Sequence, residues 1–216
     1  MKNVWDEIAE SFDATRRFPW KECIDFIEEI EGICIDIGCG NGRHLPAMAE
    51  KCKIAVGVDY SFNMLKIAKE KVNGNTLLVC CDATQLPFHD ETFDNAIFIA
   101  SLHNIKERKN RIKALKEMKR ILKKNGKALV SVWAKWQDKW RWHFLKEFFK
   151  PWKEHGDILI PWKKNGKEFM RFYHLYSMRE LKKDVAEAGF EIEKAWSVKK
   201  ATRKHADNHF LIVIKS

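Results

Sequence analysis

The chain has 216 residues, enough for one α/β domain with a buried sheet and too few to require a second domain. It shows neither a secretory signal nor an apolar run of about 20 residues, so the sequence predicts a cytoplasmic protein without a membrane partner. The six cysteines lack C-x-x-C spacing, which predicts reduced thiols and no metal site.

The charge is divided unevenly along the chain. Residues 1–100 carry 10 Lys/Arg and 17 Asp/Glu, whereas residues 101–216 carry 30 and 13. A strongly basic half predicts a polyanionic partner, nucleic acid above all, because phosphates attract lysine and arginine. A lysine-rich surface of the thermophilic kind is the alternative, and charge alone does not choose between the two.

The pattern of apolar residues predicts one continuous domain over residues 1–216, in which helices and strands alternate. Amphipathic helices at 4–15 and 20–31 are expected to form an N-terminal cover over residues 1–31. Strands are predicted at 33–37, 54–58, 76–80, 94–99, 127–133, 190–198 and 208–214, with helices at 43–51, 61–73, 107–124 and 178–188. Such alternation implies an α/β fold with a seven-stranded, mostly parallel sheet, and the last two strands are expected to pair as an antiparallel hairpin.

Aromatic residues are concentrated after the fifth strand. They are Trp133, Trp136, Trp140, Trp142, Phe144, Phe148, Phe149, Trp152 and Trp162. We interpret 134–176 as an insertion on the substrate side of the sheet, with Trp133 inside and some of Trp136, Trp140 and Trp142 exposed. An amphipathic helix over 136–150 that lies on a membrane is an alternative interpretation.

A glycine-rich turn follows the first predicted strand. It reads Asp36-Ile37-Gly38-Cys39-Gly40-Asn41-Gly42 and opens a helix, a context in which a ligand can approach the backbone closely. Its G-x-G-x-G spacing differs from the G-x-G-x-x-G of dinucleotide sites, so a nicotinamide or flavin cofactor is less favoured. The acidic Asp36 precedes the glycines, where it can receive an ammonium group or anchor the loop.

Two further carboxylates follow the next two strands. Asp59 ends the second strand, where its oxygens can accept from both hydroxyls of a ribose, and Asp82, followed by Ala83, can accept an adenine amine. Singly, a glycine turn can be a tight connection and an aspartate can be a helix cap. Three carboxylates at adjacent strand ends beside such a turn favour an S-adenosylmethionine (SAM) site.

These motifs resemble those of the class I methyltransferases. A narrower resemblance, to the tRNA wobble-uridine methyltransferases that esterify 5-carboxymethyluridine, is carried by residues 4–20 (VWDEIAESFDATRRFPW), 99–103 (IASLH), 160–162 (IPW) and 171–176 (RFYHLY), followed by Arg179-Glu180-Leu181. The chain departs from that family at Asn104 and Ile105, where members commonly carry a histidine and a tryptophan. The resemblance implies a Rossmann-like fold and a SAM site formed by Phe12, Asp36, Gly38, Cys39, Gly40, Gly42, Asp59, Tyr60, Asp82 and Ala83.

The resemblance also implies a chemistry. A substrate carboxylate is ionised at neutral pH and can attack a sulfonium methyl without losing a proton, so a cationic clamp is needed and a general base is not. Arg16 is the first candidate for the clamp, in a catalytic and substrate-binding role, because its planar fork can hold a carboxylate bidentately. It could instead hold the methionine carboxylate of SAM, or be an ordinary surface arginine.

Further candidates follow the fourth strand and the insertion. Arg171, Tyr173, His174 and Tyr176 are expected to form a second wall that binds the uridine and its phosphates. His103 is expected to act catalytically by an orienting hydrogen bond, with a structural histidine as the alternative.

Partners and rival functions complete the expectations. Residues 135–164 and the lysines of helix 107–124 are the expected tRNA platform, although the aromatic residues could instead cap the sheet. The resemblance implies a small zinc-ribbon activator protein as a second partner. Two rivals stay open: methylation of a small molecule or lipid by the same fold, and a non-catalytic SAM-binding, RNA-binding subunit.

Overall fold

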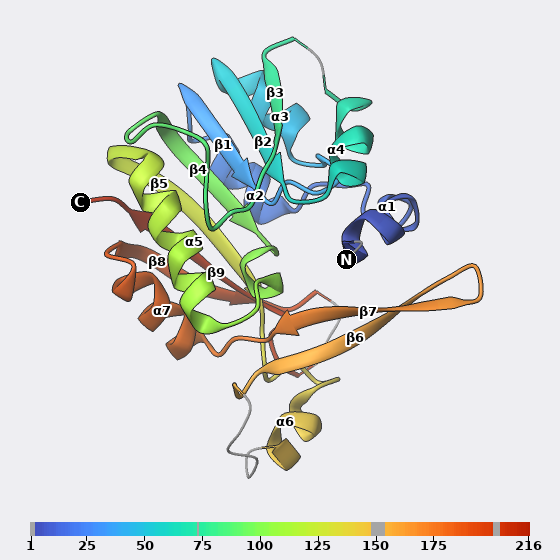
Figure 1. Ribbon diagram of the computed structural model, residues 1–216. Helices are drawn as coiled ribbons and strands as arrows, with labels where there is room; N and C mark the ends of the chain where they lie inside the picture. The colour runs from blue at the N-terminus through green and yellow to red at the C-terminus, as the bar shows by residue number, and fades with distance from the viewer. Residues whose placement is uncertain (1–2, 73, 148–153, 201–203) are drawn as a thin grey trace.

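The computed structural model describes residues 3–72, 74–147, 154–200 and 204–216. Figure 1 shows a central twisted sheet between helices, with a long two-stranded hairpin beside the N-terminal helix. The strands of the sheet are β1 (Ile33–Ile37), β2 (Ile54–Asp59), β3 (Thr76–Cys80), β4 (Phe93–Ile99), β5 (Leu122–Trp133), β8 (Glu191–Val198) and β9 (Asn208–Ile214). The helices are α1 (Val4–Asp13), α2 (Lys21–Ile27), α3 (Leu45–Lys51), α4 (Phe62–Lys69), η1 (Leu102–Asn104), α5 (Arg108–Ile121), α6 (Arg141–Glu147) and α7 (Met178–Glu187).

The strand order is β3-β2-β1-β4-β5-β9-β8. Neighbours from β3 to β5 are parallel, whereas β9 is antiparallel to both β5 and β8. This confirms the predicted seven-stranded, mostly parallel sheet with its terminal hairpin. The order reverses between β1 and β4, and in such sheets ligands bind at the carboxyl ends of the strands beside that switch point.

The two faces of the sheet are covered by different helices, as alternating side chains of buried strands require. On one face α5 and α7 pack through residues such as Leu115, Met118 and Val185. On the other face α2, α3 and α4 pack through residues such as Phe26, Met48 and Leu65. Both faces are therefore closed, and the carboxyl ends of the strands are the part of the sheet left for a ligand.

The segment 134–176 is more regular than we expected. Besides α6 it contains β6 (Asp157–Lys164) and β7 (Lys167–His174), which form a separate antiparallel sheet. The turn between them is Asn165-Gly166, and both residues have positive φ, 50° and 73°. This is the type I′ hairpin geometry, so the Asn-Gly pair between two alternating runs is the signal that could have predicted the hairpin.

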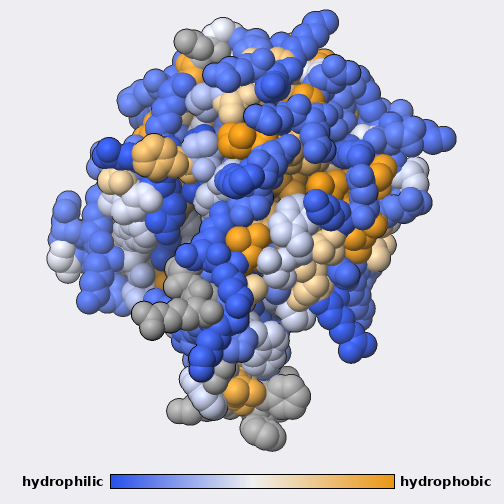
Figure 2. Space-filling model, turned by 180° about the vertical axis from the view of Figure 1, so that it is seen from behind, coloured by the Kyte–Doolittle hydropathy of each residue, from blue (hydrophilic) through white to orange (hydrophobic). Residues whose placement is uncertain are grey.

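The surface mixes charged and apolar residues. Seen from behind, hydrophobic residues form small patches separated by hydrophilic ones (Figure 2). In the described ranges no helix is long and apolar enough to cross a membrane. Of the helix considered over 136–150, the described residues include Arg141–Glu147 as α6, and 148–150 lie outside them. Trp136 and Trp142 are exposed, as expected, whereas Trp133 is half-buried.

Candidate functional site

The turn between β1 and α3 is shaped by three glycines with positive φ, 68° at Gly38, 54° at Gly40 and 74° at Gly42. A Cβ at Gly38 would lie 2.2 Å from Ser101 Oγ, and one at Gly42 would lie 2.7 Å from Ala68 Cβ. A Cβ at Gly40 would meet nothing within 4 Å. The outer glycines are therefore needed for packing, while the middle of the turn presents bare backbone that a ligand can approach.

Asp36 ends the first strand with a buried and unpartnered carboxylate. Its side chain is 1% exposed, and neither oxygen accepts a hydrogen bond. The Nδ1 atom of His44 is 3.8 Å from Oδ2, too far for a hydrogen bond. Burial lowers the pKa of His44, so this imidazole does not neutralise the carboxylate. Because an unpaired buried carboxylate is costly, the arrangement fits a site that is completed by a cationic group, such as the ammonium of SAM.

Asp59 is fixed at the end of β2 by two backbone amides. Gly40 N donates to Oδ2 and Ser61 N donates to Oδ1, both over 2.8 Å. Burial raises the pKa of Asp59 to about 6, although the two hydrogen bonds act in the opposite direction. Each oxygen keeps a second lone pair, so the carboxylate can still accept from the hydroxyls of a ribose. The neighbouring Tyr60 is exposed at the same strand end.

Asp82 lies past the end of β3 and faces solvent. Its Oδ1 accepts from Thr84 N over 2.8 Å, the pattern of an Asx turn, and Ala83 is half-buried beside it. Cys39 is buried, and its amide donates to Val58 O over 2.9 Å. The glycine turn and Asp59 are thus brought into contact, while Asp82 remains at the open rim.

Hydrogen bonds hold helix α1 against the glycine turn. The side-chain amide of Asn41 donates to Asp13 Oδ1 over 2.7 Å and to Arg16 O over 2.9 Å. Lys71 donates to the same Asp13 carboxylate and, over 3.0 Å, to Asn41 O. These contacts place Phe12 and Arg16 at the rim of the glycine turn. The sequence alone had predicted no role for Asn41.

A buried guanidinium lies on the face of the hairpin that is turned toward α1. Arg171 is 5% exposed; one Nη donates to Tyr173 Oη over 2.7 Å, and its Nε has no partner. Its Cζ lies 4.6 Å from the ring centroid of Trp162, 5.1 Å from that of Tyr173 and 5.8 Å from that of Trp5. Among the described residues no carboxylate pairs with Arg171. The rings of Trp5, Trp162 and Tyr173 form an aromatic box around Arg171. Because Trp5 and Trp162 come from segments far apart in the sequence, no local pattern could have predicted this box.

Arg16 is the second cation near this box. It donates to Thr15 O over 3.1 Å, and its Cζ lies 5.7 Å from the Phe12 ring centroid. In the described part of the chain it has no acidic partner. Burial and then repulsion from Arg16 lower the pKa of Arg171. Two cations that lack acidic partners among the described residues, one on the hairpin and one just after α1, fit an anionic ligand group.

His103 stacks beside the box. Its ring lies 5.4 Å from that of Tyr173, and the Tyr173 and Trp133 rings stack at 4.7 Å. Burial and the nearby His174 lower the pKa of His103 to about 3, so the imidazole is neutral at physiological pH. Because Nδ1 accepts from Trp133 N over 3.0 Å, the proton must reside on Nε2, where it can be donated to a ligand.

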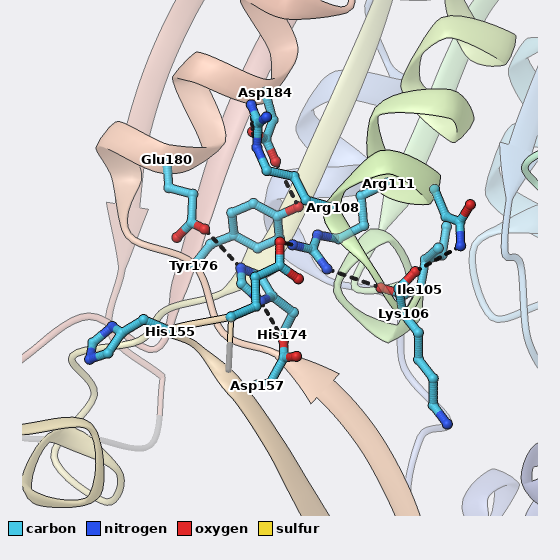
Figure 3. Close-up of polar contacts among 12 residues, drawn as sticks. Ile105, Lys106, Arg108, Arg111, His155, Asp157, His174, Tyr176, Glu180 and Asp184 are labelled. Carbon is cyan, nitrogen blue, oxygen red and sulfur yellow. Dashed lines mark hydrogen bonds and ion pairs between the residues drawn. The ribbon is translucent and has the colours of Figure 1, made fainter. Parts of the chain in front are cut away.

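His174 and Tyr176 do not join Arg171 and Tyr173, which corrects the expected wall of four residues. Strand alternation turns His174 away from the inner face; its nitrogens bond Asp157 over 2.7 Å and Glu180 over 2.9 Å. The Tyr176 hydroxyl donates to Asp184 Oδ2 over 3.2 Å. Figure 3 shows both residues in a polar network between α5, α7 and the hairpin. Both are fully buried, so in this structure they anchor the hairpin instead of lining the pocket.

Comparison with known proteins identifies the family. Residues 35–130 match the family described as a methyltransferase domain. The chain is 34% identical over 193 residues to a putative methyltransferase of Encephalitozoon cuniculi, covering 87% of this chain and 85% of that protein. The chain belongs to the class I SAM-dependent methyltransferases. The methyltransferase also shares its fold with a Methanosarcina mazei SAM-dependent methyltransferase at a TM-score of 0.75 and 24% identity, with 92% of this chain and 98% of that one covered.

Two further relatives bear on substrate and partner. The tRNA (carboxymethyluridine(34)-5-O)-methyltransferase of Xenopus tropicalis is 38% identical over 148 residues, which are 67% of this methyltransferase and 23% of that protein. The chain therefore spans less than a quarter of that relative. A putative methyltransferase of Haloferax volcanii, solved in complex with the Trm112 methyltransferase activator, has a TM-score of 0.71 at 16% identity, with 100% and 99% of the two chains covered.

Proposed function

We propose that the methyltransferase esterifies the carboxylate of 5-carboxymethyluridine at the wobble position of tRNA. The observation that carries the proposal is Arg171, a buried cation with no acidic partner among the described residues, on the hairpin face turned toward α1. Relatives named for this reaction support the choice of substrate. The basic half of the chain, with 30 of the 40 Lys/Arg in residues 101–216, fits a polyanionic substrate.

The residues present fit SAM, because neither oxygen of Asp36 accepts a hydrogen bond from a described residue, Gly40 leaves space beside the turn and Asp59 presents two oxygens. When bound, SAM supplies a methyl group on a positively charged sulfur, which keeps the bonding electron pair as the methyl moves to the substrate oxygen. The chain's task is then to hold a carboxylate oxygen in line with that methyl. Arg171 and Arg16 are suited to this, since charge-assisted hydrogen bonds to a carboxylate are directional and strong.

His103 and Tyr173 orient the substrate in this proposal. A neutral imidazole with its proton on Nε2 is a hydrogen-bond donor and cannot donate a second proton through Nδ1. Tyr173 keeps its hydroxyl proton, because burial raises its pKa to about 12. Neither group needs to act as a base, since the attacking oxygen is already ionised. The rate is therefore expected to depend on placement.

A small activator protein is the second proposed partner. Strand β3 is the edge of the sheet, and Leu77 on it is exposed. An exposed edge strand with an apolar side chain is a surface that a partner can cover by adding a strand. The complex of the Haloferax volcanii relative supports such a partner. Copurification of an activator with the wild type, and its loss in Leu77→Lys, is the expected result.

The decisive experiment is incubation with labelled SAM and tRNA that lacks the terminal ester, followed by nucleoside analysis. Labelled methyl ester on 5-carboxymethyluridine is expected, and mild alkali should release it. A label found in another nucleoside, or none with and without the activator while SAM still binds, would overturn the proposal.

A further inference from the structure

The two faces of the β6–β7 hairpin carry different residues. Arg171 lies on the inner face, so its strand neighbours Met170 and Phe172 lie on the outer face. Across the hairpin, Phe172 pairs with Leu159 and Met170 pairs with Pro161. Leu159 is 54% exposed and Met170 is 46% exposed, while Pro161 is exposed and Phe172 is half-buried. These four side chains form an apolar patch, the outer patch.

A groove of about 730 Å³ runs between this patch and the start of α5. The hairpin contributes Leu159 and Phe172 to it, and residues 106–109 form the opposite wall. A groove of this size falls in the range of about 300–1,000 Å³ typical of sites for small ligands or single residues of a polymer.

Lys106 is a charged residue of the groove that has no acidic partner in the described ranges. The other charged groups that line it have ionic partners, in the pairs Arg108–Asp184, Lys109–Glu107, Glu154–Arg111 and Asp157–His174. Lys106 has no acidic partner among the described residues, and its Nζ lies 5.8 Å from the Phe172 ring centroid. Figure 3 shows its side chain extending away from the ion pairs. The groove therefore combines an apolar, partly aromatic floor with a lysine that has no acidic partner in the described part of the chain.

We propose that the outer patch binds an unpaired nucleotide of the RNA substrate, adjacent to the nucleotide whose base enters the inner pocket. The inference rests on the proposed function. A base stacks on Phe172 and Leu159, and the phosphate that follows it lies near Lys106, as in single-strand sites that pair stacking with a basic group. The hairpin is one backbone layer thick, so neighbouring nucleotides can contact its two faces.

Charge complementarity favours RNA over a protein as the occupant. Residues 101–216 contain 30 Lys/Arg and 13 Asp/Glu, among them Lys163, which lies on the outer face beyond the patch and pairs across the hairpin with Glu168. A phosphate backbone in the groove would meet Lys106 and this excess of positive charge. An apolar protein partner would have to cover Lys106 without neutralising it.

Binding of an anticodon stem-loop RNA that carries 5-carboxymethyluridine, measured by fluorescence anisotropy over several salt concentrations, tests the proposal. Phe172→Ala is expected to weaken binding roughly 5- to 150-fold, the equivalent of about 1–3 kcal/mol for one stacked base. Phe172→Trp should retain it. Lys106→Ala should lower the slope of log K against log salt concentration by about 1.

A matched control exists on α4, where Phe62 is 58% exposed and Lys66 Nζ lies 4.9 Å from its ring centroid. The double variant Phe62→Ala/Lys66→Ala is expected to bind RNA as the wild type does. Leu159→Ser changes an exposed side chain of the same patch, so it tests the proposal even if Phe172→Ala does not fold. It should also weaken RNA binding.

The outcomes separate the two proposals. Wild-type RNA binding in both Phe172→Ala and Leu159→Ser, together with normal methylation, would overturn the outer patch and leave the proposed function intact. A concentration-dependent dimer that both variants abolish would also overturn it. A wild type that neither binds nor methylates the RNA, with its activator present, would instead remove the proposed function.

Discussion

The substitution Arg171→Met tests directly whether Arg171 binds the substrate carboxylate. The change keeps an unbranched side chain between Trp162 and Tyr173 and removes the charge, which has no acidic partner among the described residues. If Arg171 holds the substrate carboxylate, the variant loses a charge-assisted hydrogen bond at the reacting group. The binding of SAM should be unchanged, because its proposed contacts lie in the β1–α3 turn and at Asp59.

The magnitude follows from what Arg171 contacts. A hydrogen bond to a charged group contributes about 1.5–3 kcal/mol, so kcat/KM should fall roughly 10- to 150-fold. Stability responds to two opposing effects: removal of a buried unpaired cation is favourable, whereas the Tyr173 hydroxyl loses its partner at a cost of about 1–3 kcal/mol. The double variant Arg171→Met/Tyr173→Phe removes that unpaired hydroxyl and should unfold at a higher temperature than Arg171→Met.

The assay is nucleoside analysis of methylated tRNA for kcat/KM, with calorimetry for SAM and thermal unfolding on the same samples. Arg179→Met is the matched control, since Arg179 is an exposed arginine at the start of α7. If Arg171→Met methylates within about threefold of wild type while the control is also unaffected, the clamp is assigned to the wrong residue.

Three other predictions concern stability and cofactor binding. Burial alone would lower the pKa of His174, but its bonds to Asp157 and Glu180 outweigh burial and raise the pKa. The stabilisation of the wild type over His174→Gln should therefore be complete below the usual pKa of 6.5 and be lost as pH rises through the raised value. Thermal unfolding measured against pH tests this. SAM affinity of the wild type should weaken as pH falls through about 6, where Asp59 becomes protonated, and calorimetry should find this dependence absent in Asp59→Asn; an equal dependence in both proteins would exclude Asp59 as its source. Asn41→Ala should cost about 1–3 kcal/mol of unfolding free energy and weaken SAM binding, because two hydrogen bonds to half-buried acceptors are lost. Unchanged denaturant unfolding would contradict this.

The sheet was predictable because each of its signals is local. The strands from β1 to β5 contain short apolar runs, although β5 begins at Leu122, inside the predicted helix 107–124. The helices between them show one buried stripe, as in α5 with Leu115 and Met118. The glycine turn was predictable for the same reason: strand, turn and helix are consecutive, and the φ values of Gly38 and Gly40 suit glycine. Asp59 followed from its place at a strand end, since parallel strands bring their carboxyl ends to one edge.

The substrate side was harder because its contacts are long-range. Arg171 and Tyr173 could be selected from a motif, but the motif also contains His174 and Tyr176, and only the strand register separates the two pairs of side chains. Without the hairpin assignment, alternation could not be applied to RFYHLY. The partners of Arg171 illustrate the same limit, since Trp5 precedes it by most of the chain.

Helix α1 connects the cofactor turn with the substrate hairpin, and this suggests how the two halves of the site communicate. At one end Asp13 and Arg16 O accept from Asn41 in the turn. Along its length Ser11 Oγ accepts from Trp162 Nε1 over 2.9 Å, and Glu7 O accepts from Lys164 over 2.9 Å. We therefore expect a displacement of the turn to be transmitted through α1 to Trp162, whose ring lies against Arg171. Because coupling free energies are reciprocal, a substrate that orders the hairpin must tighten SAM binding to the same degree that SAM tightens substrate binding.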